Sequence, residues 1–244
     1  MDQRSPRPAV SPDLGDADDE PGGFALVFPL IALAGFVGAL GLVQWHGLFV
    51  SFMSGNTVAL GGDPALGGWR GAWEAGRAVL CFLLGAIIGE LIGSAARTWR
   101  GSAVVGTEAA LLWLALASDL RGWDGAVTVA LTGLAMGVQT AAVHKVAGTT
   151  VALTYVTGTL ISLGRGIAAA LRGAAPWRRI LPFAGSWLAL LVGSAAGGVV
   201  ARIATRDALG VAAAMASALA LLSAAGIAVR HRKSVTSRLS VKPH

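Results

Sequence analysis

The sequence predicts an all-α protein, a polytopic membrane helix bundle with six transmembrane spans. Of its 244 residues, 55% are hydrophobic and only 13% are charged, whereas soluble domains carry about 25% charged residues. The mean hydropathy is +0.67. Apolar runs close to the roughly 20 residues needed to cross a bilayer alternate with polar connections that hold most of the charge. These observations exclude an ordinary soluble domain.

Two polar tails flank a long apolar domain. Residues 1–23 include the acidic run Asp16 to Glu20 and predict a disordered cytoplasmic tail. Residues 24–230 form the predicted transmembrane domain, and residues 231–244 form a basic cytoplasmic tail expected to rest on anionic lipid headgroups. The six predicted spans are Ala25 to Val43, Ala78 to Ala96, Ala103 to Leu120, Ala126 to Val143, Ile180 to Ala201 and Leu209 to Val229.

Two shorter apolar segments each carry a polar, glycine-centred motif. The segment from Leu48 to Leu60 and the segment from Thr149 to Leu163 are both too short to cross a bilayer as a helix. Hydroxyl and amide groups cost free energy in hydrocarbon unless they are bonded, so they should face protein or a water-filled cavity. We therefore expect each segment to be a broken or re-entrant helix.

The two halves of the domain, residues 24–121 and 122–230, resemble an internal repeat. Gly55 of the first motif aligns with Gly158 of the second, and the helix after each motif ends in Ala-Arg. Both of those helices carry small residues at a spacing of four, which places them on one face where backbones can approach closely. These residues are Gly85, Gly89 and Gly93 in the first half, and Gly185, Ala189, Gly193 and Gly197 in the second.

The number of crossings per half decides the topology. If the motif segments do not cross, each half has three spans and the halves insert as inverted repeats, the plan of many transporters. If they do cross, the protein has eight spans and the halves are parallel. Segment length favours six spans. In both plans most Lys and Arg residues lie on the side of the two tails, so the positive-inside rule predicts that both termini are cytoplasmic.

The motif pair resembles the YoaK-like family of bacterial integral membrane proteins, which is domain-of-unknown-function family 1275. The likeness is carried by the stretch Leu48 to Thr57, by Gly137-Val138-Gln139 and by Thr154 to Leu160. It extends over roughly residues 25 to 229. The resemblance implies a multi-pass protein of the bacterial inner (plasma) membrane with six spans, in a family whose molecular function is not established.

The motif residues are the first candidates for a binding site. In a broken helix, backbone groups beside the break lack intrahelical partners and can bind ions or polar solutes near the bilayer midplane. Alternatively, the small residues pack helices and the hydroxyls bond the preceding turn. The candidate residues are Ser54, Gly55, Asn56, Thr57, Thr157, Gly158 and Thr159.

Glu90 and Gln139 complete the candidate set. Glu90 is interpreted as the one acid well inside a span, where a carboxylate is a candidate proton carrier or cation ligand. The structural alternative pairs Glu90 with Arg97. Gln139 ends the fourth span and could bind a polar solute near the motifs or lie at the membrane interface.

The preferred hypothesis is a small transporter or permease for a polar solute or ion, with its site between the two halves. The alternative is a non-transporting scaffold or sensor whose small-residue stripes bind partner helices. The sequence shows no catalytic motif, so we expect no enzyme. We also expect no metal site, no cofactor and no nucleic-acid partner. The expected partners are the lipid bilayer, the transported solute and, in a homo-oligomer, other copies of the chain.

Overall fold

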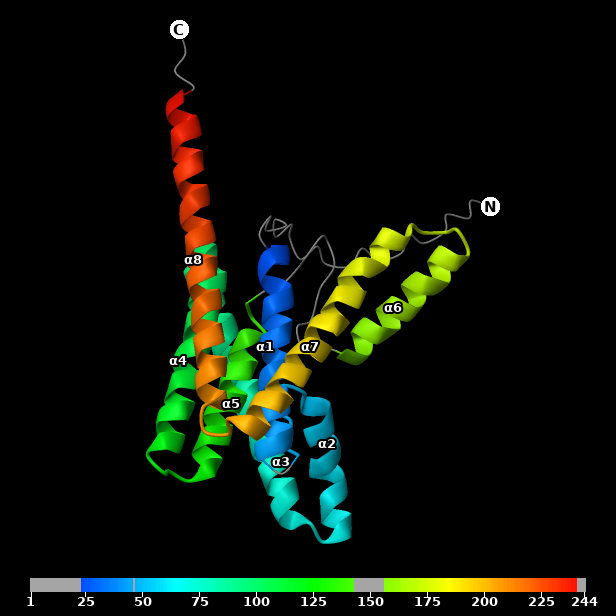
Figure 1. The fold of residues 1–244 in the computed structure, drawn as a ribbon, viewed down its shortest axis with the longest axis vertical. Coiled ribbons are helices and arrows are strands. Elements are labelled where there is room, and N and C mark those ends of the chain that lie inside the picture. The colour runs from blue at the N-terminus through cyan, green and yellow to red at the C-terminus, as the bar shows by residue number, and fades with distance from the viewer. Residues whose placement is uncertain (1–22, 46, 143–155, 241–244) are drawn as a thin grey trace, which may run out of the picture.

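The computed structural model describes residues 23–45, 47–142 and 156–240. Over these residues the chain forms helices and connections without a β-strand (Figure 1), which confirms the predicted all-α class. The helices of the first half are α1 (Gly23–Gln44), α2 (Met53–Gly62), α3 (Trp69–Ala96) and α4 (Arg100–Leu120). Those of the second half are α5 (Gly125–Gln139), α6 (Val156–Leu171), α7 (Leu181–Ile203) and α8 (Ala208–Ser240). Short 3-10 turns lie at Asp63–Leu66, Arg97–Trp99 and Trp177–Ile180.

Four described stretches are long and apolar enough to cross a membrane. They are Leu26–Gln44, Trp69–Leu120, Trp177–Ile203 and Ala208–Val229. The second of these covers 52 residues and contains both α3 and α4. Between these two helices Arg97 adopts φ 47° and ψ −110°, a conformation that ends one helix before the next begins. The fold therefore contains several spanning-length helices, as the hydropathy predicted.

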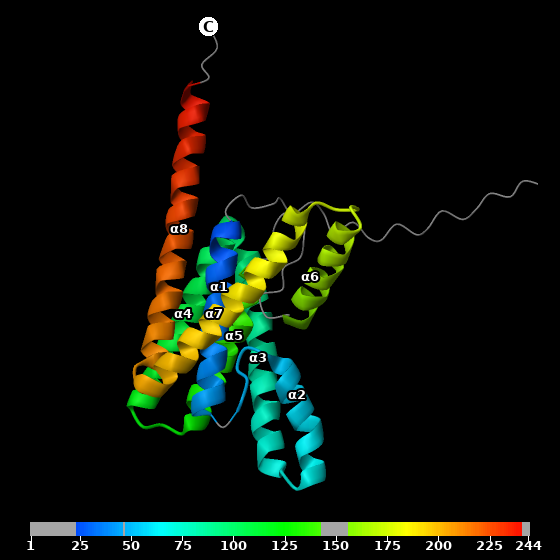
Figure 2. The same ribbon diagram turned by 45° about the vertical axis from the view of Figure 1, so that its right-hand side comes forward.

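The two motif segments contribute the short helices α2 and α6. Helix α2 has 10 residues and is about 15 Å long, roughly half of the thickness of a bilayer core. It follows a non-helical stretch, so the first motif segment is broken just before Met53. Figures 1 and 2 show α2 running to the lower end of the molecule and α6 running to the upper end. The first part of the second motif segment, residues 149–155, lies outside the described residues.

Helices of different halves cross closely at glycines. On α3, a Cβ atom at Gly85 or Gly89 would collide with the backbone of Leu134 or Val138 on α5. On α7, a Cβ atom at Gly193 or Gly197 would collide with the backbone of α1. The predicted small-residue stripes therefore bring backbones together, as expected for membrane helices. Their partners are helices of the opposite half of the same chain.

These two crossings have the same internal geometry. On α1 the residues that meet Gly193 and Gly197 are Ala32 and Phe36. The number of residues between Gly85 and Gly193 equals the number between Gly89 and Gly197. For their partners, the number between Ala32 and Leu134 equals the number between Phe36 and Val138. The reciprocal contacts follow the same rule, because Gly35 of α1 meets Leu190 of α7 and Gly137 of α5 meets Phe82 of α3. The α1–α7 and α3–α5 pairs therefore have matching contacts.

The buried core is centred on α1 and on the α4–α8 pair. Leu30, Leu33, Val37 and Leu40 of α1 are completely buried. Large apolar side chains are nevertheless exposed along the outer faces of the long helices, and such faces suit lipid rather than water. They include Leu80, Leu83, Leu84, Ile87 and Leu91 on α3, and Leu188, Leu191, Val192 and Val199 on α7.

We expect Gly197→Ala to destabilise the fold, while Gly198→Ala does not. The added methyl at position 197 meets the Phe36 backbone, which cannot move aside cheaply, whereas the neighbouring position faces open space. Overpacking of this kind costs roughly 1–3 kcal/mol, and an open helical glycine gains up to about 1 kcal/mol in helix propensity when it becomes alanine. Thermal unfolding of both purified variants in detergent measures the difference. Equal melting temperatures would contradict the α1–α7 crossing.

Candidate functional site

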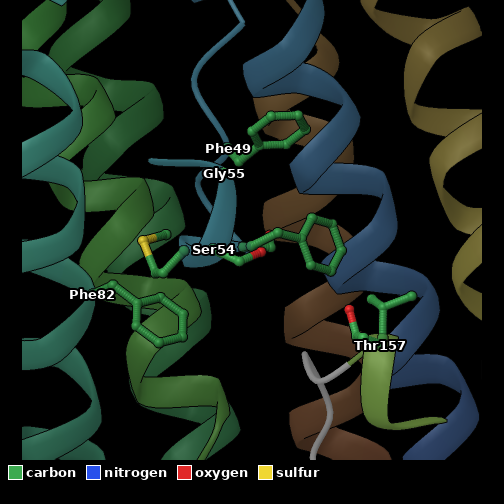
Figure 3. Close-up of a pocket in the computed structure, with 9 residues that line it drawn as sticks. Phe49, Ser54, Gly55, Phe82 and Thr157 are labelled. Carbon is green, nitrogen blue, oxygen red and sulfur yellow. The ribbon is translucent and has the colours of Figure 1, made fainter. Parts of the chain in front are cut away.

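The beginnings of α2 and α6 meet at one cavity of about 460 Å³. Figure 3 shows Ser54 of α2, Phe82 of α3 and Thr157 of α6 around the same space. Most of the wall comes from the first motif segment, and α6 supplies two residues. The lining residues are Phe49, Ser51, Phe52, Met53, Ser54, Gly55, Phe82, Val156 and Thr157.

Backbone donors of α2 begin at this cavity. The residue before the helix, Phe52, has φ −125° and ψ 89°, and no side chain caps the helix. The first N–H groups of a helix have no intrahelical partner. Met53, Ser54 and Gly55 carry such groups, and all three residues line the cavity. The break in the first motif segment therefore places hydrogen-bond donors at the cavity wall.

Asn56 holds this break in place and does not line the cavity. Its side chain is buried, with 2% exposed. Its Oδ1 accepts a hydrogen bond from the Phe49 backbone N–H at 3.1 Å, and its Nδ2 donates one to the Phe49 backbone oxygen at 2.5 Å. This pair satisfies both backbone groups of Phe49 in the non-helical stretch. The structure thus gives Asn56 a positioning role in place of the predicted place in the cavity wall.

The other motif residues divide between lining and packing. Ser54 and Thr157 line the cavity, and so does Gly55, which was expected to permit a break but lies inside α2. Thr57 does not, because its hydroxyl donates to the Met53 backbone oxygen at 2.8 Å. That contact is the local bond to the preceding turn that the sequence left as an alternative. Gly158 and Thr159 follow Thr157 on α6 and are not among the lining residues.

Gly55 also has a steric reason to be glycine. A Cβ atom there would lie 2.8 Å from Cδ2 of the Phe49 ring. The Phe49 side chain therefore packs directly over the first turn of α2, beside the backbone that Asn56 binds. The aromatic ring and the amide together fix the approach of the chain to the helix.

Ser51 and Phe82 belong to the cavity wall but were missed by the sequence reasoning. Ser51 is fully buried, and its hydroxyl has no hydrogen-bond partner in the described part of the chain. It stands next to α1, where a Cβ atom at Gly38 would lie 3.7 Å from its oxygen. Because Ser51 lies inside the first motif segment, the sequence alone could have identified it as a candidate site residue. Phe82 comes from the middle of an apolar helix, and nothing in the local sequence distinguishes it.

Glu90 lies outside the cavity wall and forms an ion pair. Its Oε2 is 2.7 Å from Nη2 of Arg100, and its side chain is half exposed. Arg100 also donates from Nε to the Ala141 backbone oxygen at 3.0 Å. The partner is therefore Arg100 at the start of α4, where the sequence had suggested Arg97. This cluster joins α3, α4 and the chain just after α5.

Gln139 is not among the residues of the cavity wall and connects two helices. It is fully buried at the end of α5, and its Nε2 donates to the Leu30 backbone oxygen of α1 at 3.0 Å. Its Oε1 is buried without a partner among the described residues. The structure therefore places Gln139 inside the helix bundle.

Glu108 is a second acid within the helices, and the structure buries it more deeply than Glu90. Neither oxygen of its carboxyl is exposed or has a hydrogen-bond partner in the described ranges. The interpretation of Glu90 as the one acid well inside a span is therefore wrong. The missed signal was spacing, because Val104, Glu108 and Leu112 recur every four residues and share the buried face of α4. Within the described residues, no group of three potential metal ligands comes together.

We expect Asn56→Ala to destabilise the protein by about 1–3 kcal/mol, because each buried backbone group left without a partner costs about that much. The matched control is Thr57→Val, which removes a hydroxyl bonded only within its own helix and should change stability by less than about 0.5 kcal/mol. Thermal unfolding in detergent tests both. If both variants lowered the melting temperature by the same small amount, the hydrogen bonds between Asn56 and Phe49 would not be what holds the non-helical stretch in place.

Comparison with known proteins agrees with the apolar helices and the motif pair. Residues 26–222 match the family described as "Protein of unknown function (DUF1275)". The chain is 36% identical over 184 residues to the UPF0700 transmembrane protein RA0705 of Rhizobium meliloti (strain 1021), a match that covers 74% of this chain and 76% of that relative. No solved structure matches the chain. This transmembrane protein therefore belongs to the DUF1275 family, as the motif pair predicted.

Proposed function

We propose that this protein is a small transporter or permease that moves a small polar solute or ion through the cavity between its two halves. The observation that carries the proposal is the shared cavity, because the polar motif of each half contributes to it. Discontinuous helices that present backbone groups at an internal site are the usual binding device of secondary transporters. A purely structural bundle has no need for such a break beside a cavity that both motifs line.

A six-span inverted repeat underlies this proposal. The spans are α1, α3, α4, α5, α7 and α8, and α2 and α6 are re-entrant half-helices. The equivalent α1–α7 and α3–α5 crossings support two related halves. The opposite directions of α2 and α6 in Figure 1 support their inversion. In such a plan each half can close one side of the site in turn.

The charge distribution supports an inner-membrane orientation with both termini in the cytoplasm. In Figure 1 the turn between α6 and α7 lies at the same end as the last residues of α8. Arg172, Arg178 and Arg179 belong to or flank that turn. The turn between α4 and α5 lies at the opposite end. The basic end is the cytoplasmic one under the positive-inside rule.

No observation favours the scaffold alternative. That hypothesis needs the glycine stripes to accept a partner helix, but Gly85 and Gly89 are covered by α5 and Gly193 and Gly197 by α1. The next glycine of the first stripe, Gly93, is covered by the Arg100 side chain. The stripes therefore form internal crossings.

Single cysteines in a Cys81→Ser background test the topology. Leu66→Cys, in the turn after α2, should react with a membrane-impermeant maleimide only from outside the cell. Ala174→Cys, in the turn after α6, should react only from the cytoplasm. Both native side chains are exposed, so labelling reports sidedness rather than burial. Reaction of both positions from the cytoplasmic side would contradict six spans and fit eight, because the motif helices would then cross.

Filling the cavity tests transport. We expect Ser54→Trp to reduce solute flux by at least about tenfold, which corresponds to about 1.4 kcal/mol of barrier, because the indole occupies the space between α2 and α6. Val58→Trp is the matched control, since Val58 lies on the same helix, is 74% exposed and does not line the cavity. Light scattering of proteoliposomes under gradients of urea, glycerol, sodium chloride and potassium nitrate measures flux. No flux above protein-free liposomes for any solute, or equal loss in both variants, would contradict the proposal.

A further inference from the structure

The geometry points to a small monovalent anion as the solute class that this cavity binds. This inference rests on the proposed function, because it concerns the same cavity. It is carried by the described part of the wall, which combines the N-terminus of α2, a buried hydroxyl without a partner among the described residues, and nine lining residues without a charged side chain.

The first turn of α2 directs its positive end at the cavity. The N-terminus of a helix carries about half a positive elementary charge, from the N–H groups of its first turn. Met53, Ser54 and Gly55 belong to this turn, and all three line the cavity. Such an end binds anions directly through backbone N–H groups. The first described residues of α6, Val156 and Thr157, complete the opposite side of the wall.

The buried hydroxyl of Ser51 is an independent sign of a polar ligand. Buried hydroxyl groups in native proteins almost always have a hydrogen-bond partner. Ser51 belongs to the cavity wall and is fully buried, yet its oxygen has no partner among the described residues. Rotation of its C–O bond lets the hydroxyl donate to an acceptor that enters the cavity. Ser54 and Thr157 add two further hydroxyls to the wall.

The wall offers little to a cation. None of the nine lining residues carries a carboxylate. The Phe49 carbonyl, which could have been a ligand, is already bonded by Asn56. The Glu90 carboxylate is paired with Arg100 and is not part of the wall. Hard cations bind through several oxygen ligands, and this wall presents donors instead.

The same wall selects among anions. None of the nine described lining residues is Lys or Arg, and the α2 terminus offsets only about half a negative charge, so a divalent anion would keep far more uncompensated charge than a monovalent one. Phe49, Phe52 and Phe82 make much of the surface apolar, which suits an anion that loses its hydration easily. Nitrate has this character and serves as the probe, with sulfate as the divalent comparison.

Binding is tested first, without transport. The purified protein in detergent should show a saturable rise in melting temperature with millimolar potassium nitrate, and no comparable rise with potassium sulfate at equal ionic strength. Ser54→Asp places a fixed carboxylate beside the same N–H groups and should abolish the nitrate effect. Ser54→Asn has the size of Ser54→Asp without the charge and should weaken the nitrate effect much less. Equal responses of the two variants would overturn the inference.

Flux is measured in parallel in proteoliposomes loaded with potassium nitrate, with valinomycin present to balance charge and a nitrate electrode as the detector. We expect nitrate efflux to exceed sulfate efflux by at least about tenfold, and Ser54→Asp to lower nitrate efflux at least about tenfold more than Ser54→Asn does. If Ser54→Asp does not fold, Ser51→Ala takes its place. That variant removes an unpartnered hydroxyl and should raise the nitrate concentration at half-saturation without lowering stability.

The outcomes separate this inference from the proposed function. A saturable nitrate shift without flux of any solute supports an anion site and contradicts a transporter. Flux of urea, glycerol or sodium with no nitrate dependence supports a transporter and overturns the anion site. Absence of both the nitrate shift and all flux overturns both.

Discussion

The close glycine crossings between the two halves are the constraint on which the rest of the structure depends. Carbonyl groups of α1 and α5 lie where side chains of α7 and α3 would be if those positions were not glycine. Lipid offers no hydrophobic force to pull helices together, so close packing of backbones has to hold them. Because α1 pairs with α7 and α5 with α3, each half is held by the other, and the motif helices α2 and α6 are brought to a common cavity.

Sequence reasoning recovered the class of the fold and a break in the first motif segment. The break lies just before Met53, however, whereas the glycines expected to permit the breaks, Gly55 and Gly158, lie inside α2 and α6. Hydropathy predicted the long helices, and segment length predicted that the motif segments would be too short to span. It could not identify side-chain partners, because these depend on tertiary contacts. The glycine stripes were recognised without the helices that they contact, the structural alternative for Glu90 named Arg97 in place of Arg100, and Glu108 was passed over. A count of the four-residue spacing around Glu108 would have found its buried face.

The predicted site residues also fall into two groups, those that line the cavity and those that do not. Ser54, Gly55 and Thr157 were identified from the motif alone and line the cavity. Asn56 was identified as well, but for a role in the wall that it does not have, since its amide bonds the Phe49 backbone. A motif shows that a polar residue is required at a position; it does not show whether that residue faces a ligand or the chain itself. Thr159 stands where the first half has Asn56, so the two motifs are related without being chemically identical.

The amide pairing of Asn56 has a mechanical consequence. Its two hydrogen bonds connect Phe49, in the non-helical stretch before α2, to the first turn of that helix, so residues 49–56 are held together as one unit. Gly47 and Gly67 stand on either side of that unit with φ 85° and 78°, and neither is crowded by neighbours. Both glycines can serve as hinges, because glycine changes between backbone conformations at little cost in free energy. Most residues of the cavity wall lie between these two glycines, so a rotation at both would move that side of the cavity as one unit.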